Sequence, residues 1–331
     1  MKKLKFGIIC YPEMELDKIK SACLENNVDF KEIDFMSPSW LDECDSEIDG
    51  YLVRPPCLYE EHKSIFDERV YFINKVLKKP IYPSFDELFT YENKRNMHLF
   101  LKGYNVPHAK TQVFMRKTEA LDLLDEIEFP VVSKSNIGAG GSAVRIIKTK
   151  REYKRLVNRV FGYIHPEFTL GWFPVLNKNN IPSPRFGRAQ KHYLIIQEFL
   201  KIKWEWRMIR IGDSYIGHQK LIGDNGFASG SELVGWEKPS DELLNLLRDT
   251  TEKMGMRCMT LDIFETLDGS FYINEMQAII GAYRPYQMKI DGKPGRFIYE
   301  NGAFKFEEGI HCQNACWNPR VEDFINQLKG E

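Results

Sequence analysis

Three side chains with oxygen ligands lie on one predicted β-hairpin, where they could hold a metal ion. Asp262 precedes an Asp268-Gly269 turn, and Glu275 and Gln277 follow it. An Asp-Gly pair between two runs rich in β-branched and aromatic residues predicts a tight hairpin, which brings Asp262 towards the other two. Glu275 and Gln277 are two residues apart, so their side chains leave the same face of their strand. Hard oxygen ligands of this kind suit Mg²⁺. A half-polar surface hairpin is the alternative that this motif alone leaves open.

A glycine-rich loop that follows a lysine could bind phosphate groups. A predicted strand ends at Lys134, and the next strand begins after a loop that contains Gly138, Gly140, Gly141 and Ser142. Because the lysine precedes the glycines and the chain returns to a strand, this is no Walker A motif. The loop instead predicts a mobile flap whose backbone N–H groups approach phosphate oxygens while Lys134 supplies a positive charge. A glycine-rich hairpin beside a solvent lysine is the alternative.

Other predicted elements carry further polar residues that could join these two motifs. Lys94 lies on a helix. Glu205 and Arg207 are two residues apart on a predicted strand and therefore share a face, and the next strand, 214–221, carries Lys220. Just before these strands an apolar run ends in Gln197, Glu198, Phe199 and Leu200.

The first part of the chain alternates between strands and helices, which predicts a small parallel sheet with crossover helices. Ligands of such sheets bind at the carboxyl ends of strands, where Tyr11, Glu13 and Arg54 occur. Arg54 could hold a substrate carboxylate, or it could be an exposed loop arginine. No Gly-x-Gly-x-x-Gly follows the first strand, so the sequence disfavours dinucleotide binding there.

The remaining signals divide the chain into four parts. A Ser84-x-x-Glu87 capping box begins a helix that is expected to end at Gly103. A smaller unit follows, with a helix that Thr118 can cap and that runs through Ile127, and a helix capped by Ser240 precedes the metal hairpin. The basic, proline-rich stretch 163–193 could close over an acidic substrate or form a solvated loop. We expect an N-terminal α/β domain at 1–84, a connecting helix and linker at 85–106, and two further units at 107–197 and 198–331.

Composition limits the classes of partner. The chain has 331 residues, and its 46 Lys and Arg nearly balance its 47 Asp and Glu. The net charge of the chain is therefore too small to attract nucleic acid or an anionic membrane, and we expect neither as a partner. The seven cysteines are scattered and predict no disulfide framework. No apolar run is long enough for a bilayer, and the apolar run 6–10 is too short for a signal peptide, so a cytoplasmic protein is expected.

Taken in order, the motifs resemble those of the ATP-grasp superfamily, most of all its ribosomal-protein glutamate ligase and D-alanine ligase type. The resemblance covers about residues 85–290. It rests on Lys94, Lys134 with its flap, the run 197–200, Glu205-x-Arg207 and the metal hairpin. It implies an α/β (α+β) chain in which a small parallel N-terminal domain precedes two α+β subdomains that clasp ATP.

The resemblance also implies a role for each position. Lys94 and Lys134 would contact the ATP phosphates, the flap would cover them, and residues 197–200 would line the adenine pocket. Glu205 is the candidate ribose ligand. Arg207 and Lys220 would be catalytic and face the γ-phosphate or an acyl phosphate. Two Mg²⁺ ions, which Mn²⁺ could replace, would be held by Asp262, Glu275 and Gln277. The family usually has Asn at the position of Gln277, followed by Pro-Gly, where this chain has Ile280-Gly281.

The implied activity is that of an ATP-dependent carboxylate–amine ligase. It would pass through an acyl phosphate, release ADP and phosphate, and act on an amino acid, a peptide or another small anionic substrate. Arg54, Tyr283 and Arg284 are the candidate substrate contacts. An ATP-grasp kinase and a non-catalytic nucleotide-binding protein are the competing interpretations. A homo-oligomer is suggested by analogy alone.

Overall fold

The structure is a computed structural model that describes residues 3–11, 15–44, 47–57, 60–137, 144–162, 192–223, 228 and 233–330, and the backbone of 174–176 and 182–184. Several positions singled out in the sequence lie outside the described residues. They are Glu13, the flap residues Gly138, Gly140, Gly141 and Ser142, and most of the stretch 163–193. In the described part, no helix is long and apolar enough to cross a membrane.

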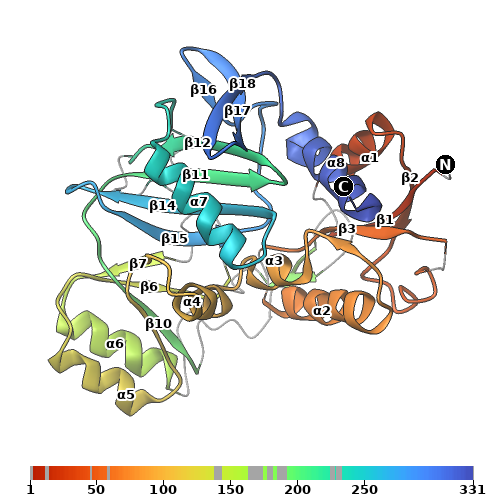
Figure 1. Cartoon of the computed structure of the whole chain (residues 1–331). Coiled ribbons are helices and arrows are strands. Elements are labelled where there is room, and N and C mark those ends of the chain that lie inside the picture. Colours follow the sequence, from red (N-terminus) through yellow and green to blue (C-terminus); the bar gives the residue numbers. More distant parts are fainter. Residues whose placement is uncertain are drawn as a thin grey trace.

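The chain begins with a four-stranded parallel sheet in the order β2-β1-β3-β4, as predicted (Figure 1). Every residue of β3 is buried, because helices cover both faces of the sheet. The elements are β1 (Lys5–Cys10), α1 (Leu16–Glu25), β2 (Asp29–Ile33), β3 (Gly50–Arg54), α2 (Glu60–Tyr71), the π-helical turn η1 (Phe72–Val76) and β4 (Ile81–Tyr82).

The last helix of the chain returns to this first sheet. Helix α8 (Gln313–Lys329) packs beside α1, and Figure 1 shows the two helices next to each other. The Phe324 ring lies 4.9 Å from the ring of Phe6 and 5.5 Å from that of Tyr82, measured between centroids. The N-terminal unit therefore shares its hydrophobic core with the C-terminal end of the chain.

A small lobe consists of a four-stranded antiparallel sheet with helices on one face. The strand order is β5-β10-β6-β7, and Tyr153 and Val157 of α6 are fully buried against the sheet. The expected cap at Thr118 and the expected end at Ile127 are wrong. The helix begins at Lys117, because the Ala120 N–H already bonds to the Arg116 carbonyl, and it ends in a 3₁₀ turn at residues 123–125. The elements are β5 (Thr111–Phe114), α5 (Lys117–Asp122), η2 (Leu123–Asp125), β6 (Val131–Lys134), β7 (Val144–Ile147), α6 (Lys150–Val160) and β10 (Leu194–Glu198).

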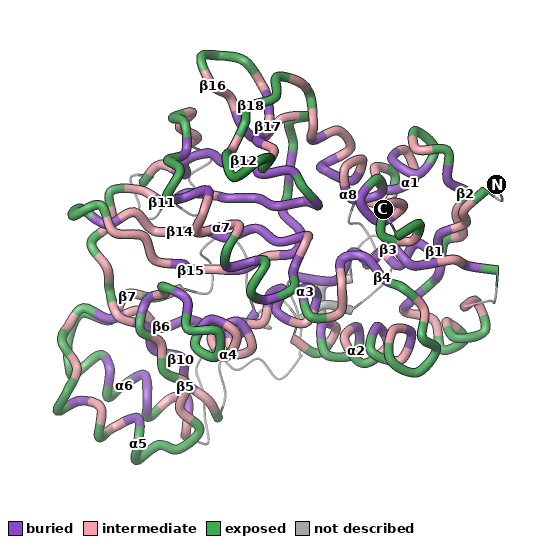
Figure 2. The backbone as a smooth tube through the Cα atoms, in the orientation of Figure 1, coloured by how far each residue is buried: buried purple, intermediate pink, exposed green. Residues whose placement is uncertain are grey.

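A large lobe is built on a sheet in the order β15-β14-β11-β12-β17-β16, with β13 and β18 paired to its side. Helix α7 is capped by Ser240, as predicted, and packs on one face of the sheet. The middle of this sheet is buried in Figure 2. The elements are β11 (Ile202–Ile211), β12 (Ser214–Lys220), β13 (Val234–Gly235), α7 (Asp241–Lys253), β14 (Cys258–Thr266), β15 (Phe271–Gln277), β16 (Lys289–Ile290), β17 (Lys293–Glu300) and β18 (Ala303–Glu308); the short β8 (Pro174–Leu176) and β9 (Pro182–Pro184) pair with each other elsewhere.

Two helices, not one, connect the first sheet to the lobes. The capping box at Ser84 and Glu87 is present, but α3 (Phe85–Thr90) ends where Tyr91 becomes extended. A second helix, α4 (Lys94–Gly103), begins because Asn93 accepts a hydrogen bond from the backbone of its first turn. Gly103 is the last helical residue and not the predicted left-handed cap. The left-handed conformation falls on Asn105, with φ 47°.

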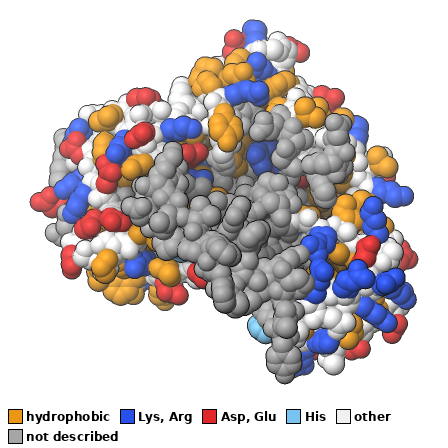
Figure 3. All heavy atoms as spheres, turned by 180° about the vertical axis from the view of Figure 1, so that it is seen from behind, with side chains coloured by type: hydrophobic (Ala, Val, Ile, Leu, Met, Phe, Trp, Pro, Cys, Tyr) orange, Lys and Arg blue, Asp and Glu red, His pale blue; other side chains and the backbone are white. Residues whose placement is uncertain are grey.

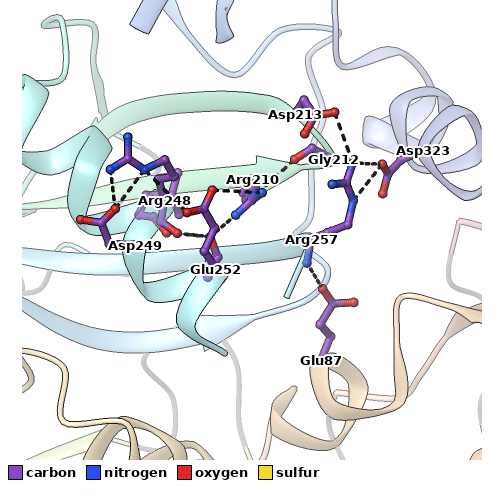
Figure 4. Close-up of polar contacts among 11 residues, drawn as sticks. Glu87, Arg210, Gly212, Asp213, Arg248, Asp249, Glu252, Arg257 and Asp323 are labelled. Atoms are coloured by element: carbon purple, nitrogen blue, oxygen red, sulfur yellow. Dashed lines mark hydrogen bonds and ion pairs between the residues drawn. The ribbon is translucent and has the colours of Figure 1, made fainter. Parts of the chain in front are cut away.

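A network of buried polar contacts joins α3, α8 and the large lobe. The Glu87 carboxylate accepts hydrogen bonds from the backbone N–H groups of Arg257 and Cys258, each at 2.6 Å, as well as from Ser84 at 2.7 Å. The Arg257 guanidinium donates to Asp323 of α8 at 2.8 Å (Figure 4). Glu87 therefore acts as a cap for α3 and as an anchor for the start of β14.

Candidate active site

A cavity of about 710 Å³ lies where the three parts of the chain meet. Its walls come from the ends of β3 and α3, from β6, β7 and β10 of the small lobe, and from β11, β12, β14 and β15 of the large lobe. Most residues singled out in the sequence line it, namely Arg54, Lys134, Gln197, Glu198, Phe199, Leu200, Glu205, Arg207, Lys220, Asp262, Glu275, Gln277 and Tyr283.

Strand register places three of the charged side chains in one row. Arg207 of β11 lies opposite Asp262 of β14, and Asp262 lies opposite Glu275 of β15. Residues directly opposite each other project from the same face of a sheet, so the row faces the cavity. Apolar neighbours such as Met208 and Leu261 face the other way and are fully buried with α7. The period of two in each strand thus separates the site from the core.

Asp262 is surrounded by positive charge. The Arg207 guanidinium donates from Nε and Nη2 to the two carboxylate oxygens, each at 2.9 Å, in a bidentate pair. Lys220 Nζ donates to Asp262 Oδ2 at 2.9 Å and also contacts the Glu205 carboxylate. Burial by itself would raise the pKa of Asp262, but Arg207 and Lys220 outweigh it and hold that pKa well below its usual range. The aspartate is therefore ionised at neutral pH.

Asn274 is a site residue that the sequence analysis missed. Asp262 pairs with Glu275 but Ile263 pairs with Ile273, so Asn274 is the extra residue of a β-bulge. The bulge turns its amide into the cavity, where Oδ1 accepts a hydrogen bond from Lys134 Nζ at 2.7 Å and Nδ2 donates to Glu205 Oε2 at 3.4 Å. Strict alternation of side chains along the strand would place Asn274 on the face opposite to Glu275. The sequence pattern therefore gave no sign that Asn274 belongs to the cavity.

The two predicted phosphate lysines are both buried beside Glu275. Lys94 is the first residue of α4, and its Nζ lies 3.9 Å from Glu275 Oε1. Lys134 is 6% exposed, and burial is the main cause that lowers its pKa to about 8, with Lys94 acting in the same direction and Glu275 against it. Lys134 therefore carries its charge at neutral pH but loses it in a weakly alkaline solution.

The predicted ribose ligand Glu205 has other neighbours in this structure. Its carboxylate contacts Lys220 and Asn274, and it is 2% exposed. Burial raises its pKa, although Lys220 acts in the opposite direction. Glu205 thus connects Lys134, through Asn274, to the cluster around Asp262, and a contact with ribose stays a prediction.

The hairpin residues offer a donor set that fits Mg²⁺. Asp262 and Glu275 supply carboxylates, and the Gln277 amide donates to Glu275 Oε2 at 3.3 Å, so the two side chains lie together. Within the described residues, no three His, Cys, Asp or Glu side chains form a metal-binding group. Two carboxylates and one amide match the usual Mg²⁺ site, in which water and substrate phosphates complete the shell.

Part of the cavity wall is apolar. Val132 and Ile146 of the small lobe and Phe264 of the large lobe line it, and none of them was expected from the sequence. The predicted run from Gln197 to Leu200 forms its edge. The Glu198 carboxylate turns outward and accepts a hydrogen bond from the Lys110 N–H at 2.6 Å. This apolar part of the wall could contact a flat ring.

The candidate substrate contacts differ in their surroundings. Arg54 is 5% exposed and lines the cavity, so its interpretation as an exposed loop arginine is wrong. It ends β3 beside β1, where the strand order reverses, and its Nη1 donates to the Tyr91 hydroxyl at 3.0 Å. Tyr283 is 96% exposed at the rim. Arg284 lies over the Trp236 ring and does not line the cavity.

Comparisons with known proteins agree on the architecture. No family model and no curated protein matches the chain. Among solved structures, N5-carboxyaminoimidazole ribonucleotide synthetase from Thermotoga maritima matches with a TM-score of 0.59 at 15% identity, over 98% of this chain and 76% of that one. D-cycloserine synthetase DcsG matches with a TM-score of 0.59 at 13% identity, over 98% and 99%.

A third match is the ATP-grasp ligase PsnB, solved with a precursor peptide and AMPPNP. Its TM-score is 0.57 at 13% identity, over 99% of both chains. Identities this low establish the architecture and not the substrate. The chain has the ATP-grasp fold, as its motifs predicted.

Proposed function

We propose that the protein is an ATP-dependent carboxylate–amine ligase that works through an acyl phosphate. The observation that carries the proposal is the Arg207–Asp262–Lys220 cluster, which lies in one cavity with Lys134 and Glu275. Such a concentration of cations and carboxylates suits phosphoryl transfer, which depends on positioning and on neutralising negative charge. Solved neighbours that are ATP-grasp ligases support the same class.

The cavity suggests how ATP would lie. Its apolar wall, with Val132, Ile146 and Phe264, suits the adenine ring, and Lys134 suits the phosphates. Lys94 does not line the cavity, and its charge would act through its position 3.9 Å from Glu275. Asp262, Glu275 and Gln277 would hold Mg²⁺, which when bound neutralises charge on the phosphate oxygens. Arg207 and Lys220 would then face the transferred phosphoryl group.

The proposed reaction has two steps. A substrate carboxylate oxygen attacks the γ-phosphorus, and the bond to the ADP oxygen breaks as ADP leaves. An amine nitrogen then attacks the acyl carbon, the carbon–oxygen bond to phosphate breaks, and the nitrogen loses a proton to solvent. Arg207 and Lys220 stabilise the negative charge in the first step and on the departing phosphate in the second. Neither step needs a covalent bond to the protein.

Arg54 is our candidate anchor for the substrate that carries the carboxylate. It lies in the cavity wall formed by the N-terminal sheet, where its Nε is 3.5 Å from Glu15 Oε2 and its Nη1 donates to the Tyr91 hydroxyl. The planar guanidinium of a buried arginine in a cavity wall suits a carboxylate. One solved neighbour was bound to a ribonucleotide and another to a precursor peptide, so both small and peptide substrates belong in a test.

The test is a panel of carboxylates and amines, including peptides, incubated with ATP and Mg²⁺. We expect one pair to give ADP, phosphate and an amide of the corresponding mass. With an ¹⁸O-labelled carboxylate, one ¹⁸O should appear in the released phosphate, as an acyl phosphate requires. A stable phosphorylated product would instead indicate a kinase, and ATP binding without turnover across the panel would contradict both activities.

A further inference from the structure

The outer face of α6 carries a dense strip of positive charge. Lys150, Arg151, Lys154 and Arg155 are exposed, and Arg159 is half-buried on the next turn. Figure 3 shows lysine and arginine side chains gathered over the small lobe, at the lower right. The whole chain has a formal net charge of −1, so this strip reflects placement and not composition.

The positive charges of this strip destabilise α6. Lys150 with Lys154, Arg151 with Arg155, and Arg155 with Arg159 are like charges four residues apart, an arrangement that destabilises a helix. Lys150 and Arg151 also lie in the first turn, where positive charge opposes the helix dipole. None of the four exposed cations has an ion-pair partner within the described residues. A charged surface that does not stabilise the structure around it suggests a role in binding a partner.

The one acidic residue of α6 does not neutralise the strip. Glu152 belongs to the cap of the helix, because its N–H bonds to Thr149 Oγ1 at 3.2 Å and its Oε2 accepts a hydrogen bond from the Lys148 N–H at 2.8 Å. Its charge is therefore held at the helix N-terminus, and no ion pair joins it to Lys154 or Arg155 within the described residues. The outer part of the strip stays uncompensated.

The negative charge on the neighbouring helix α5 limits how wide a partner bound to α6 can be. Helix α5 packs against α6, and the Tyr153 hydroxyl donates to the Ala120 carbonyl at 2.9 Å. Exposed acidic residues lie on α5 and in the segment after it. They are Glu119, Asp122, Asp125, Glu126 and Glu128. A nucleic-acid duplex or a membrane would cover both helices and meet this repulsion, whereas a single extended chain can follow α6 alone.

The spacing of the cations on α6, and the burial of its aromatic residue, favour an extended peptide over single-stranded nucleic acid. Cations four residues apart on a helix are about 6 Å apart along its axis. Alternate residues of an extended peptide are about 6.6 Å apart, so acidic side chains at every second position can meet successive cations. The aromatic residue of α6, Tyr153, is fully buried, so the helix offers no ring on which a base could stack.

We propose that α6 is a docking surface for an extended acidic peptide segment. No residue of α6 lines the cavity, so the surface is separate from the candidate active site. The inference goes beyond the proposed ligase activity and does not depend on it, because binding can be measured without ATP.

Fluorescence anisotropy with a labelled peptide of alternating Glu and Ser tests the proposal. We expect saturable binding at low salt that weakens as salt is added. The double variant Lys154→Glu/Arg155→Glu should bind about tenfold more weakly. The control Lys78→Glu/Lys102→Glu makes the same change in net charge at exposed lysines on other helices and loops, and its affinity should stay within about twofold of the wild type. Unchanged thermal unfolding of both variants excludes a loss of fold.

Three results would overturn the proposal. The first is an absence of binding at low salt. The second is an equal loss of affinity in the two variants, which would mean that only the net charge matters. The third is equal or tighter binding of a labelled DNA duplex to the wild type, which would assign the strip to nucleic acid.

Discussion

Two buried carboxylates, Asp262 and Glu87, show how differently this chain uses the same group. Asp262 lines the cavity and accepts hydrogen bonds from the side chains of Arg207 and Lys220. Glu87 lies outside the cavity lining and accepts hydrogen bonds from backbone N–H groups at α3 and at the start of β14. Figure 4 shows the bond from Arg257. Their pKa values move in opposite directions, because nearby cations lower that of Asp262 whereas burial raises that of Glu87.

The type of hydrogen-bond donor explains why the two carboxylates have different roles. Arg207 and Lys220 are long side chains that can turn from Asp262 to a phosphate group, so the aspartate can be released to a ligand. The backbone donors around Glu87 are fixed by the helix and strand to which they belong. Buried charge therefore suggests a ligand site here only where its partners are side chains that face a cavity.

The largest effect is expected on the cavity side. Glu275→Ala and Lys134→Ala should each reduce ATP turnover on the order of 100-fold or more, because each removes a charge close to the proposed phosphates. Steady-state ADP release measures this effect. Thermal unfolding should change little, and wild-type turnover in both variants would refute the site assignment.

On the other side of the comparison, Glu87→Ala should lower the free energy of unfolding by about 3 kcal/mol or more, since it leaves three backbone donors without their partner. Urea denaturation followed by circular dichroism measures this loss. Glu87→Gln is the matched control, and it should lose less because it keeps an acceptor oxygen. Turnover per folded molecule should stay near that of the wild type; a large fall would move Glu87 into the catalytic group.

Asn274 tests whether the bulge serves the site. Asn274→Ala removes the link between Lys134 and Glu205, and we expect the KM for ATP to rise about tenfold. Asn158→Ala, at an exposed position of α6, is the control and should leave KM unchanged. Equal KM values for both variants and the wild type would make the bulge a purely structural feature.

The smallest effect is a pH dependence from Lys134. Its pKa is lowered to about 8 by burial, so the charged form is present below that pH and is lost as the pH rises through it. The KM for ATP should therefore rise several-fold between about pH 7 and pH 9.5. Lys134→Arg keeps its charge over this range and should lack the rise. The same rise in this variant would assign the titration to another group.

Local patterns in the sequence anticipated much of the framework. The Asp268-Gly269 turn, the two-residue spacing of Glu275 and Gln277, and the capping box at Ser84 each depend on neighbouring residues only. Gly269 has the positive φ, 85°, that such a turn requires. These features could be predicted because the physical cause lies within a few positions of the effect. The roles of these residues towards ATP stay predictions.

Features that depend on distant residues were missed or misjudged. Arg54 could be a loop arginine or a site residue until the sheet order placed it at the switch point. The break between α3 and α4 has a local cause and was nevertheless missed: Asn93 supplies a second N-cap within a stretch that was interpreted as one helix. Glu205 could not be paired with Lys220 from spacing, because the pairing is set by the register of β11 and β12.

Local patterns predicted the order of most elements, the faces of the regularly alternating strands and the charged residues from which a site could be built. Which of those residues meet depends on the tertiary structure. A single extra residue in β15 turns Asn274 into the cavity, and the packing of α3 against β14 turns the Glu87 carboxylate into an anchor. The physical reason is that spacing along a chain sets direction, whereas contact between distant segments depends on how whole elements pack.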